Sequence, residues 1–193
     1  VDNPGAFAGG QDAESDEELR QRLLESYHAV SNGSNAAYYR RLALAQDGVA
    51  SVHVIQLPRG SGSVDLVIAG EGAAASEDTV EALGELVARQ RELGVDAQVT
   101  AAEEQPCPVT LELWPGENYA FDDVKAQAEE AVRELFRRLA VAQPLYTARI
   151  IGTVMAVPGV ENCRLTAPAA DLPGAERSLI TLGDLTVTKG ADA

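Results

Sequence analysis

The sequence contains few aromatic residues, few cysteines and few basic residues. Aromatic side chains make up 5% of the 193 residues, and the two cysteines are Cys107 and Cys163. A single potential bridge in a chain of this size is a weak disulfide signal, so we expect both thiols to be reduced. Lys and Arg number 15 against 30 Asp and Glu, a formal net charge of -15. This negative field opposes phosphates and anionic lipid headgroups, so we expect neither nucleic acid nor a membrane as a partner.

Long apolar runs and catalytic motifs are also missing. No window approaches the roughly 18 consecutive apolar residues that a membrane helix needs. His28 and His53 have no neighbouring cysteine, serine elbow or second histidine that would indicate a triad or a ligand set. We therefore expect no enzymatic activity, no cofactor and no metal. The sequence opens with Val1 rather than Met and has no basic-then-apolar leader, so we expect a trimmed or processed piece.

An acidic run, DAESDEE at 12–18, precedes the first helical pattern. Three interpretations compete: a cation site, a solvated acidic face, and a helix start that joins two parts of an assembly. The run lacks the D-x-[DN]-x-[DN]-G order of a calcium loop, which argues against a cation site. Ser15 and Glu18 have the spacing of a capping box, and the acids between them would lie in the first helical turn. We therefore expect order to begin at Ser15, after a linker or arm over 1–14.

Residues 15–104 are expected to form one small lobe with the element order α-α-β-β-α-β. Apolar spacing predicts a first helix from Ser15, a second within NAAYYRRLALAQ, and a third over 76–93. Alternation predicts strands over VASVHVIQL and GSVDLVIAG, joined as a hairpin by PRGSG, and a last strand over VDAQVT. The spacing in the second helix places Tyr38, Leu42 and Ala45 on its buried side.

Residues 105–193 are expected to form a second lobe with the order β-α-α-β-β. The two prolines in EEQPCP exclude both a helix and a central strand at 103–108, so we place the domain boundary there. VTLELW alternates as a strand, the helix over 121–139 carries Glu-to-Arg pairs four residues apart, and another helix and the strand VENCRL follow. The predicted fold class is α+β, with two small lobes in which helices pack on a short, mostly antiparallel sheet.

A short internal echo links the two lobes. YYRRLALAQDGVASVHVI and ARIIGTVMAVPGVENCRL each run from a helical pattern through a Gly-Val turn into a strand pattern. Glycine after a helix is common turn chemistry and explains such an echo without any repeat. Structural pseudo-symmetry between the lobes is the alternative interpretation.

One stretch resembles a nucleotide-binding motif. VIAGEGAAAS places the loop from Gly70 to Ala75 between a strand and a helix, as a dinucleotide fingerprint does. Glu71 within the turn and the acids Glu77 and Asp78 at the helix start would repel a pyrophosphate. We therefore expect a plain strand-to-helix loop. A nucleotide-binding enzyme domain using this loop and a small ligand-sensing α+β module are the alternative functions.

Four stretches resemble the baseplate J-like protein family of contractile phage tails and prophage-derived injection systems: GGQDAESDEELRQRL, NGSNAAYYRRLALAQDGVASVHVI, GSVDLVIAG and AVPGVENCRL. The resemblance implies a structural wedge component that forms part of the baseplate ring, contacts other wedge proteins and neighbouring copies of itself, and catalyses nothing. It implies a place in the virion baseplate after assembly in the bacterial cytoplasm. It also implies a further N-terminal region that this chain lacks, with the run around Ser15 and Glu18 as the junction.

The few aromatic residues are the candidate anchors of an assembly surface, because interface centres concentrate aromatic side chains. The candidates are Tyr38, Tyr39, Trp114 and Tyr119. Tyr38 and Tyr39 diverge by about 100° on a helix, so we expect one of them to be exposed or at an interface. Trp114 and Tyr119 are either lids on the core or contact residues. We expect the isolated chain to be a monomer or weak dimer, because the implied N-terminal region is missing and highly charged chains repel one another.

Overall fold

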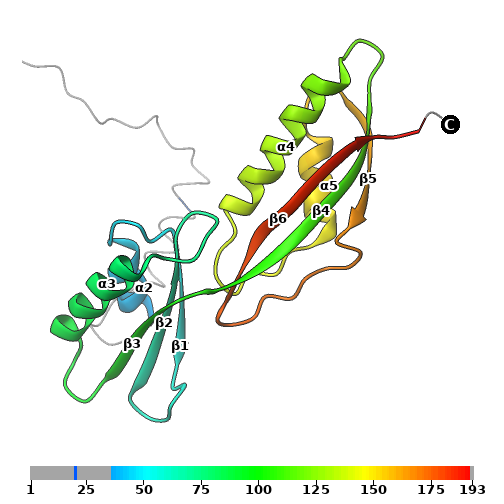
Figure 1. Cartoon of the computed structure of the whole chain (residues 1–193). Helices are drawn as coiled ribbons and strands as arrows, with labels where there is room; N and C mark the ends of the chain where they lie inside the picture. Colours follow the sequence, from blue (N-terminus) through cyan, green and yellow to red (C-terminus); the bar gives the residue numbers. More distant parts are fainter. Residues whose placement is uncertain (1–19, 21–35, 192–193) are drawn as a thin grey trace, which may run out of the picture.

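The computed structural model describes residues 20 and 36–191. These residues form two sheets of three strands each, with helices on one face of each sheet (Figure 1). The α+β fold class with two small lobes is therefore confirmed. We call residues 36–102 the first lobe and residues 103–191 the second lobe. The predicted helix start at Ser15 and Glu18 lies outside the described residues.

The sheet of the first lobe has the strand order β1-β2-β3. β1 (Ser51–Gln56) and β2 (Ser63–Ala69) are antiparallel and form the predicted hairpin, and β3 (Asp96–Ala101) lies parallel to β2. α2 (Ala36–Leu44) precedes the hairpin, and α3 (Glu77–Gln90) makes the crossover from β2 to β3. The side chains between these helices and the sheet form one buried cluster: Tyr39, Ala43, Val49, Val52, Leu66, Ile68, Ala75, Leu83 and Val87.

The buried side of α2 differs by one residue from the predicted one. Tyr39 and Ala43 are fully buried, whereas Tyr38 and Leu42 are half-buried and Ala45 is exposed beyond the helix end. Tyr39 and Ala43 are four residues apart, as are Tyr38 and Leu42, and α2 has only 9 residues. Helical spacing alone therefore could not separate the two stripes.

The sheet of the second lobe has the strand order β5-β4-β6. β4 (Glu103–Pro115) is central, with β5 (Val160–Ala167) antiparallel on one side and β6 (Ser178–Lys189) parallel on the other. α4 (Phe121–Arg137) and α5 (Thr147–Met155) cover one face. The second core lies between them and the sheet, and its largest fully buried side chains include Leu111, Leu113, Phe136, Leu145 and Ile150.

At the predicted boundary, residues 103–108, the chain is extended and forms the start of β4. The first five residues of β4 pair with β6 and with no other described strand, so β4 is an edge strand here and becomes central only from Thr110 onward. The Glu103 N–H donates to the carbonyl just before β6 (2.8 Å), and amides alternate sides along a strand. Pro106 and Pro108 therefore direct their missing N–H groups away from β6. β5 pairs with β4 only from Thr110 onward, so the prolines face a side without a strand neighbour.

β3 and β4 are joined through Ala102 alone and cross from one lobe to the other as one ribbon (Figure 1). The Ala102 N–H donates to the carbonyl of Ile68 in β2 (2.9 Å), and the next N–H, that of Glu103, donates to the carbonyl of Arg177 (2.8 Å). Consecutive amides therefore bond to opposite sides, and the strand exchanges one set of neighbours for the other between these residues. The two lobes share one strand.

The two sheets have the same arrangement in space. In each, the central strand has one antiparallel neighbour that follows a helix, β1 after α2 and β5 after α5, and one parallel neighbour. The turns that lead into β1 and β5 contain Gly48 (φ 85) and Gly159 (φ 89), as the internal echo indicates. The chain visits the strands in a different order in each lobe. The likeness is therefore one of architecture and not a sequential repeat.

Candidate functional site

Tyr38 and Tyr39 lie in different surroundings. The Tyr39 side chain is fully buried, and its ring packs edge-on against that of Tyr38, with 5.3 Å between centroids. Its hydroxyl has no hydrogen-bond partner among the described residues, and burial, with Tyr38 and Glu92 adding to the effect, raises the pKa of this hydroxyl. The Tyr38 hydroxyl donates to the backbone carbonyl of Gln90 (3.2 Å) and so ties α2 to the end of α3. Tyr39 is thus a core residue, and an interface role for Tyr38 stays a prediction.

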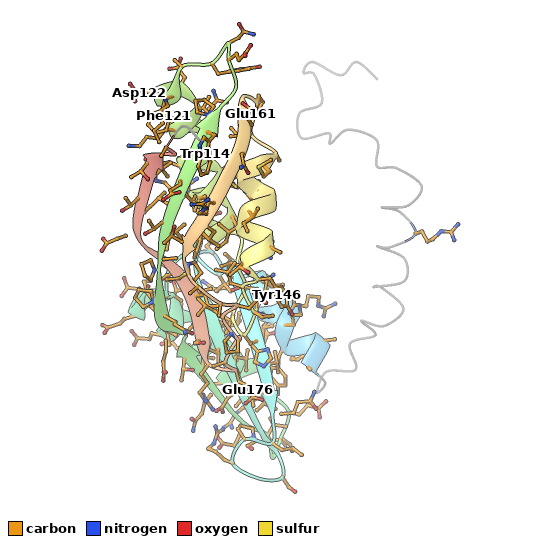
Figure 2. All side chains as sticks on the ribbon, turned by 90° about the vertical axis from the view of Figure 1, so that its right-hand side faces the viewer. Trp114, Phe121, Asp122, Tyr146, Glu161 and Glu176 are labelled. Carbon is orange, nitrogen blue, oxygen red and sulfur yellow. The ribbon has the colours of Figure 1, made fainter. Side chains whose placement is uncertain are left out.

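Trp114 lies on the sheet face opposite the helices, in the upper part of the second lobe in Figure 2. Its Nε1 donates to the carbonyl of Ala191 (3.0 Å). Gly190 lies directly against the indole, because a Cβ added there would be 2.0 Å from a ring carbon. The Arg164 guanidinium lies 5.5 Å from the ring centroid, a cation–π contact. Trp114 therefore holds Gly190 and Ala191, which follow β6, and a contact role for its remaining surface stays a prediction.

Tyr119 lies in the turn between β4 and α4 and is 52% exposed. One side of its ring covers Gly159, where an added Cβ would lie 2.5 Å from the ring, and a Cβ at Gly116 would lie 3.7 Å from it. The ring is thus held against the turn before β5 while much of its surface faces solvent. Tyr119 is the most exposed of the four aromatic candidates.

The Gly70–Ala75 loop connects β2 to α3, as predicted, and packs against the second lobe. Its Ala74 N–H donates to the carboxylate of Glu104 (2.8 Å). Gly72 has φ 66, and a Cβ there would lie 3.2 Å from the Cα of Arg137 at the end of α4. An amide of this loop thus already binds a carboxylate of the chain. The glycine permits close contact with α4.

A buried carboxylate lies where the two lobes meet. The Asp65 side chain on β2 is 4% exposed and accepts hydrogen bonds from Arg59, in the β1–β2 turn, and Arg177, just before β6. Arg59 also pairs with Asp96 (3.0 Å). Burial opposes ionisation of Asp65, but the hydrogen bonds from Arg177 and Arg59 outweigh it and hold the pKa of the carboxyl below its ordinary value. No sequence motif marks this cluster, because Asp65 and Arg177 are 112 residues apart.

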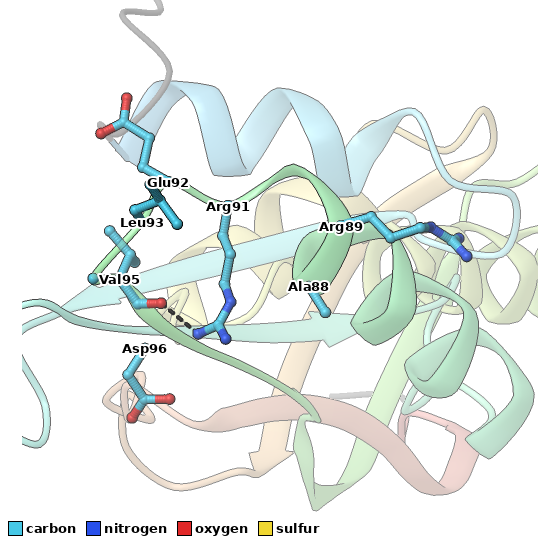
Figure 3. Close-up of a pocket in the computed structure, with 8 residues that line it drawn as sticks. Ala88, Arg89, Arg91, Glu92, Leu93, Val95 and Asp96 are labelled. Carbon is cyan, nitrogen blue, oxygen red and sulfur yellow. Dashed lines mark hydrogen bonds between the residues drawn. The ribbon is translucent and has the colours of Figure 1, made fainter.

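The described part of the chain shows no group of three or more His, Cys, Asp or Glu that could hold a metal ion. None of the described helices is long and apolar enough to cross a membrane. One hollow of about 560 Å³ lies at the turn between α3 and β3, where Arg91 donates to the carbonyl of Val95 (Figure 3). The side chains around it offer no paired acid and base. Cys107 and Cys163 are both free, as predicted, and burial raises the pKa of each thiol.

These features define a two-lobed α+β fold. Its polar clusters connect elements of the same chain. Two family models match the chain consecutively: the Baseplate J-like central domain over residues 31–110 and the Baseplate J-like protein C-terminal domain over residues 107–188. Together they cover residues 31–188, which include the helices of both described lobes. The chain belongs to the baseplate J-like family, as its sequence resemblance indicates.

The relatives extend beyond this chain. The phage-like element PBSX protein XkdT of Bacillus subtilis (strain 168) is 21% identical over 190 residues, covering 92% of the chain and 55% of that protein. Protein YqbT of the same organism is 27% identical over 142 residues, covering 68% of the chain and 40% of that protein. The chain thus spans about half the length of these relatives. A chain of the anti-feeding prophage (AFP) baseplate, solved by cryo-EM, shares the fold with a TM-score of 0.59 at 12% identity, over 92% of this chain and 43% of its own length.

Proposed function

We propose that this chain is a structural component of the baseplate of a contractile phage tail or prophage-derived tail-like particle, and that it acts by protein–protein assembly. The observation that carries the proposal is the consecutive match of the central and C-terminal baseplate J-like domains across both lobes. Within the particle, the chain is a wedge component that contacts other wedge proteins and copies of itself. It catalyses nothing, is assembled in the bacterial cytoplasm and resides in the virion baseplate.

We infer that the chain has two domains, over 15–104 and 105–193, preceded by a linker or arm over 1–14. Two buried clusters support this division, one between α2, α3 and the first sheet and the other mainly between α4, α5 and the second, joined by Val67 and Ala69 of β2. The ranges of the two family models meet at residues 107–110. The shared strand makes these domains one continuous unit and not two independent bodies.

The test of baseplate function is the location of an epitope-tagged copy of the full-length protein in purified particles. Immunogold label at the baseplate end of the tail is the expected result, with particles from an untagged strain as the control. Deletion of the gene should give tails without complete baseplates. Normal particles after deletion, with the tagged protein left in the soluble fraction, would overturn the proposal.

The oligomeric state of the isolated chain is a separate question. We expect light scattering to give the mass of one 20.3 kDa chain or two, with self-association that weakens at low salt because the -15 chains repel one another. A stable ring whose mass does not depend on salt would contradict this expectation. It would also mean that the implied N-terminal region is unnecessary for ring formation.

The alternative functions can be separated by thermal shift. A dinucleotide present at a hundred times its dissociation constant should add about 2.7 kcal/mol to the stability of a binding domain. We expect no stabilisation by nicotinamide or flavin dinucleotides, because the Ala74 N–H of the Gly70–Ala75 loop already donates to Glu104. Reproducible stabilisation would favour the nucleotide-binding alternative, and stabilisation by another small molecule would favour a ligand-sensing module.

A further inference from the structure

Arg177 braces the point at which the shared strand passes between the lobes. Its carbonyl accepts the N–H of Glu103 (2.8 Å), the residue directly after the linking Ala102. Its guanidinium reaches across the junction to the Asp65 carboxylate on β2. Arg177 therefore contacts β4 through its backbone carbonyl and the first lobe through its side chain. The backbone itself joins the two lobes through Ala102 alone.

The charges around Asp65 make this contact selective for one orientation of the lobes. Arg59 belongs to the first lobe and is held there by Asp96 (3.0 Å), so it stays beside Asp65 wherever the second lobe lies. Arg177 is the partner that the second lobe supplies. The four alternating charges of Asp96, Arg59, Asp65 and Arg177 sum to zero. A rotation that withdrew Arg177 would leave a buried carboxylate with less compensation, so the rotation is opposed.

Other contacts also cross the junction, among them the hydrogen bond from the Ala74 N–H to the Glu104 carboxylate (2.8 Å). The Val141 N–H donates to Ser51 Oγ (3.3 Å), and Val67 and Ala69 of β2 contribute to the buried cluster of the second lobe. Apolar contacts hold surfaces together but are non-directional. The guanidinium–carboxylate pair has a defined direction. The ion pair, like the hydrogen bonds of Ala74 with Glu104 and of Val141 with Ser51, therefore restricts the orientation of the lobes in a way that the apolar patch does not.

We propose that the Asp65–Arg177 ion pair is an interlobe clamp that fixes the relative orientation of the two lobes, with Ala102 as the pivot when the clamp is open. This role concerns the internal stiffness of the chain and does not depend on the identity of its assembly partners. Arg177 is suited to the role because 43% of its side chain remains exposed, so the clamp lies at the edge of the junction and can be released without unfolding a core.

The experiment measures the distance between two spin labels, one on each lobe, by dipolar electron paramagnetic resonance. The labels are attached to A88C on α3 and A126C on α4, both exposed positions, in a Cys163→Ser background. The remaining thiol, Cys107, is 1% exposed, so we expect no labelling of it in the folded protein. We expect a narrow distance distribution in this parent. Arg177→Gln is expected to broaden and shift the distribution.

The matched control is Arg164→Gln, which removes an arginine that pairs with Glu112 (3.3 Å) within the second lobe. It should leave the distribution unchanged, and Arg177→Lys, which keeps the charge, should restore much of the parent's narrow distribution. Asp65→Asn tests the other side of the clamp and should act like Arg177→Gln. Distributions equal to the parent's in Arg177→Gln, with circular dichroism showing a folded protein, would overturn the proposal. Equal broadening in Arg164→Gln would overturn it as well.

Discussion

Replacing Tyr39 with phenylalanine should stabilise the protein, although the residue is fully buried in the first core. The change keeps the ring and its edge-on contact with Tyr38, and it removes a buried hydroxyl that has no described partner. A buried hydroxyl without a hydrogen bond costs roughly 1 to 3 kcal/mol. The oxygen leaves a void of roughly 10 Å³, which costs only about 0.2 kcal/mol. The expected net gain in the free energy of unfolding is therefore about 1 kcal/mol or more.

The neighbouring Tyr38→Phe variant is a matched control, because it makes the same chemical change one residue away. The Tyr38 hydroxyl donates to the backbone carbonyl of Gln90 (3.2 Å), so its loss should destabilise the protein by about 0.5 to 1.5 kcal/mol. Urea unfolding followed by far-ultraviolet circular dichroism measures both variants. Opposite signs are the expected result. If Tyr39→Phe lost as much stability as Tyr38→Phe, its hydroxyl would be hydrogen-bonded in solution and the reasoning would be refuted.

Three further predictions concern other contacts. Gly190→Val should displace the Trp114 indole, red-shift the fluorescence of this single tryptophan and cost roughly 1 to 3 kcal/mol of stability; an unshifted spectrum would contradict the packing. The pKa of Asp65 is lower in the folded state than in the unfolded state. The ionised Asp65 carboxylate therefore contributes fully to the free energy of unfolding above the unfolded-state pKa of about 4, and this contribution is lost as the pH falls through the folded-state pKa. The melting temperature of the parent should therefore fall more steeply in acid than that of Asp65→Asn, and parallel curves would count against this. Asp171→Ala removes the carboxylate that accepts the Thr147 N–H (2.7 Å) at the start of α5, so hydrogen exchange at this amide should accelerate, and unchanged exchange would exclude the capping role.

Local patterns predicted the parts of the fold that depend on local chemistry. Alternating apolar residues around the turn PRGSG located β1 and β2 and their antiparallel pairing. The Glu-to-Arg spacing on α4 predicted the ion pairs of Glu129 with Arg133 (3.0 Å) and of Glu134 with Arg138 (2.7 Å). The signature stretches over 9–70 and near β5 indicated the family by their residues alone. Each of these features is contained within a few neighbouring residues.

The features that sequence reasoning missed depend on neighbours distant in the chain. Prolines such as Pro106 and Pro108 ordinarily argue against a central strand, but whether a proline is tolerated depends on which side of the strand lacks a neighbour. That side is decided by where β5 begins to pair with β4. The cluster at Asp65 likewise requires Arg177, which only the shared strand brings near β2. Such contacts follow from the tertiary arrangement, and no local pattern encodes them.

The shared strand gives the chain unequal resistance to different mechanical loads. A pull along the direction of β3 and β4 runs through one unbroken backbone, and the hydrogen bonds to β2 and β6 lie across that direction. These bonds must therefore shear together, because no single bond at the end of a ladder can open first. A sideways force concentrates at Ala102, where the strand changes neighbours. The molecule should thus extend little under tension along β3 and β4 and should bend first at Ala102.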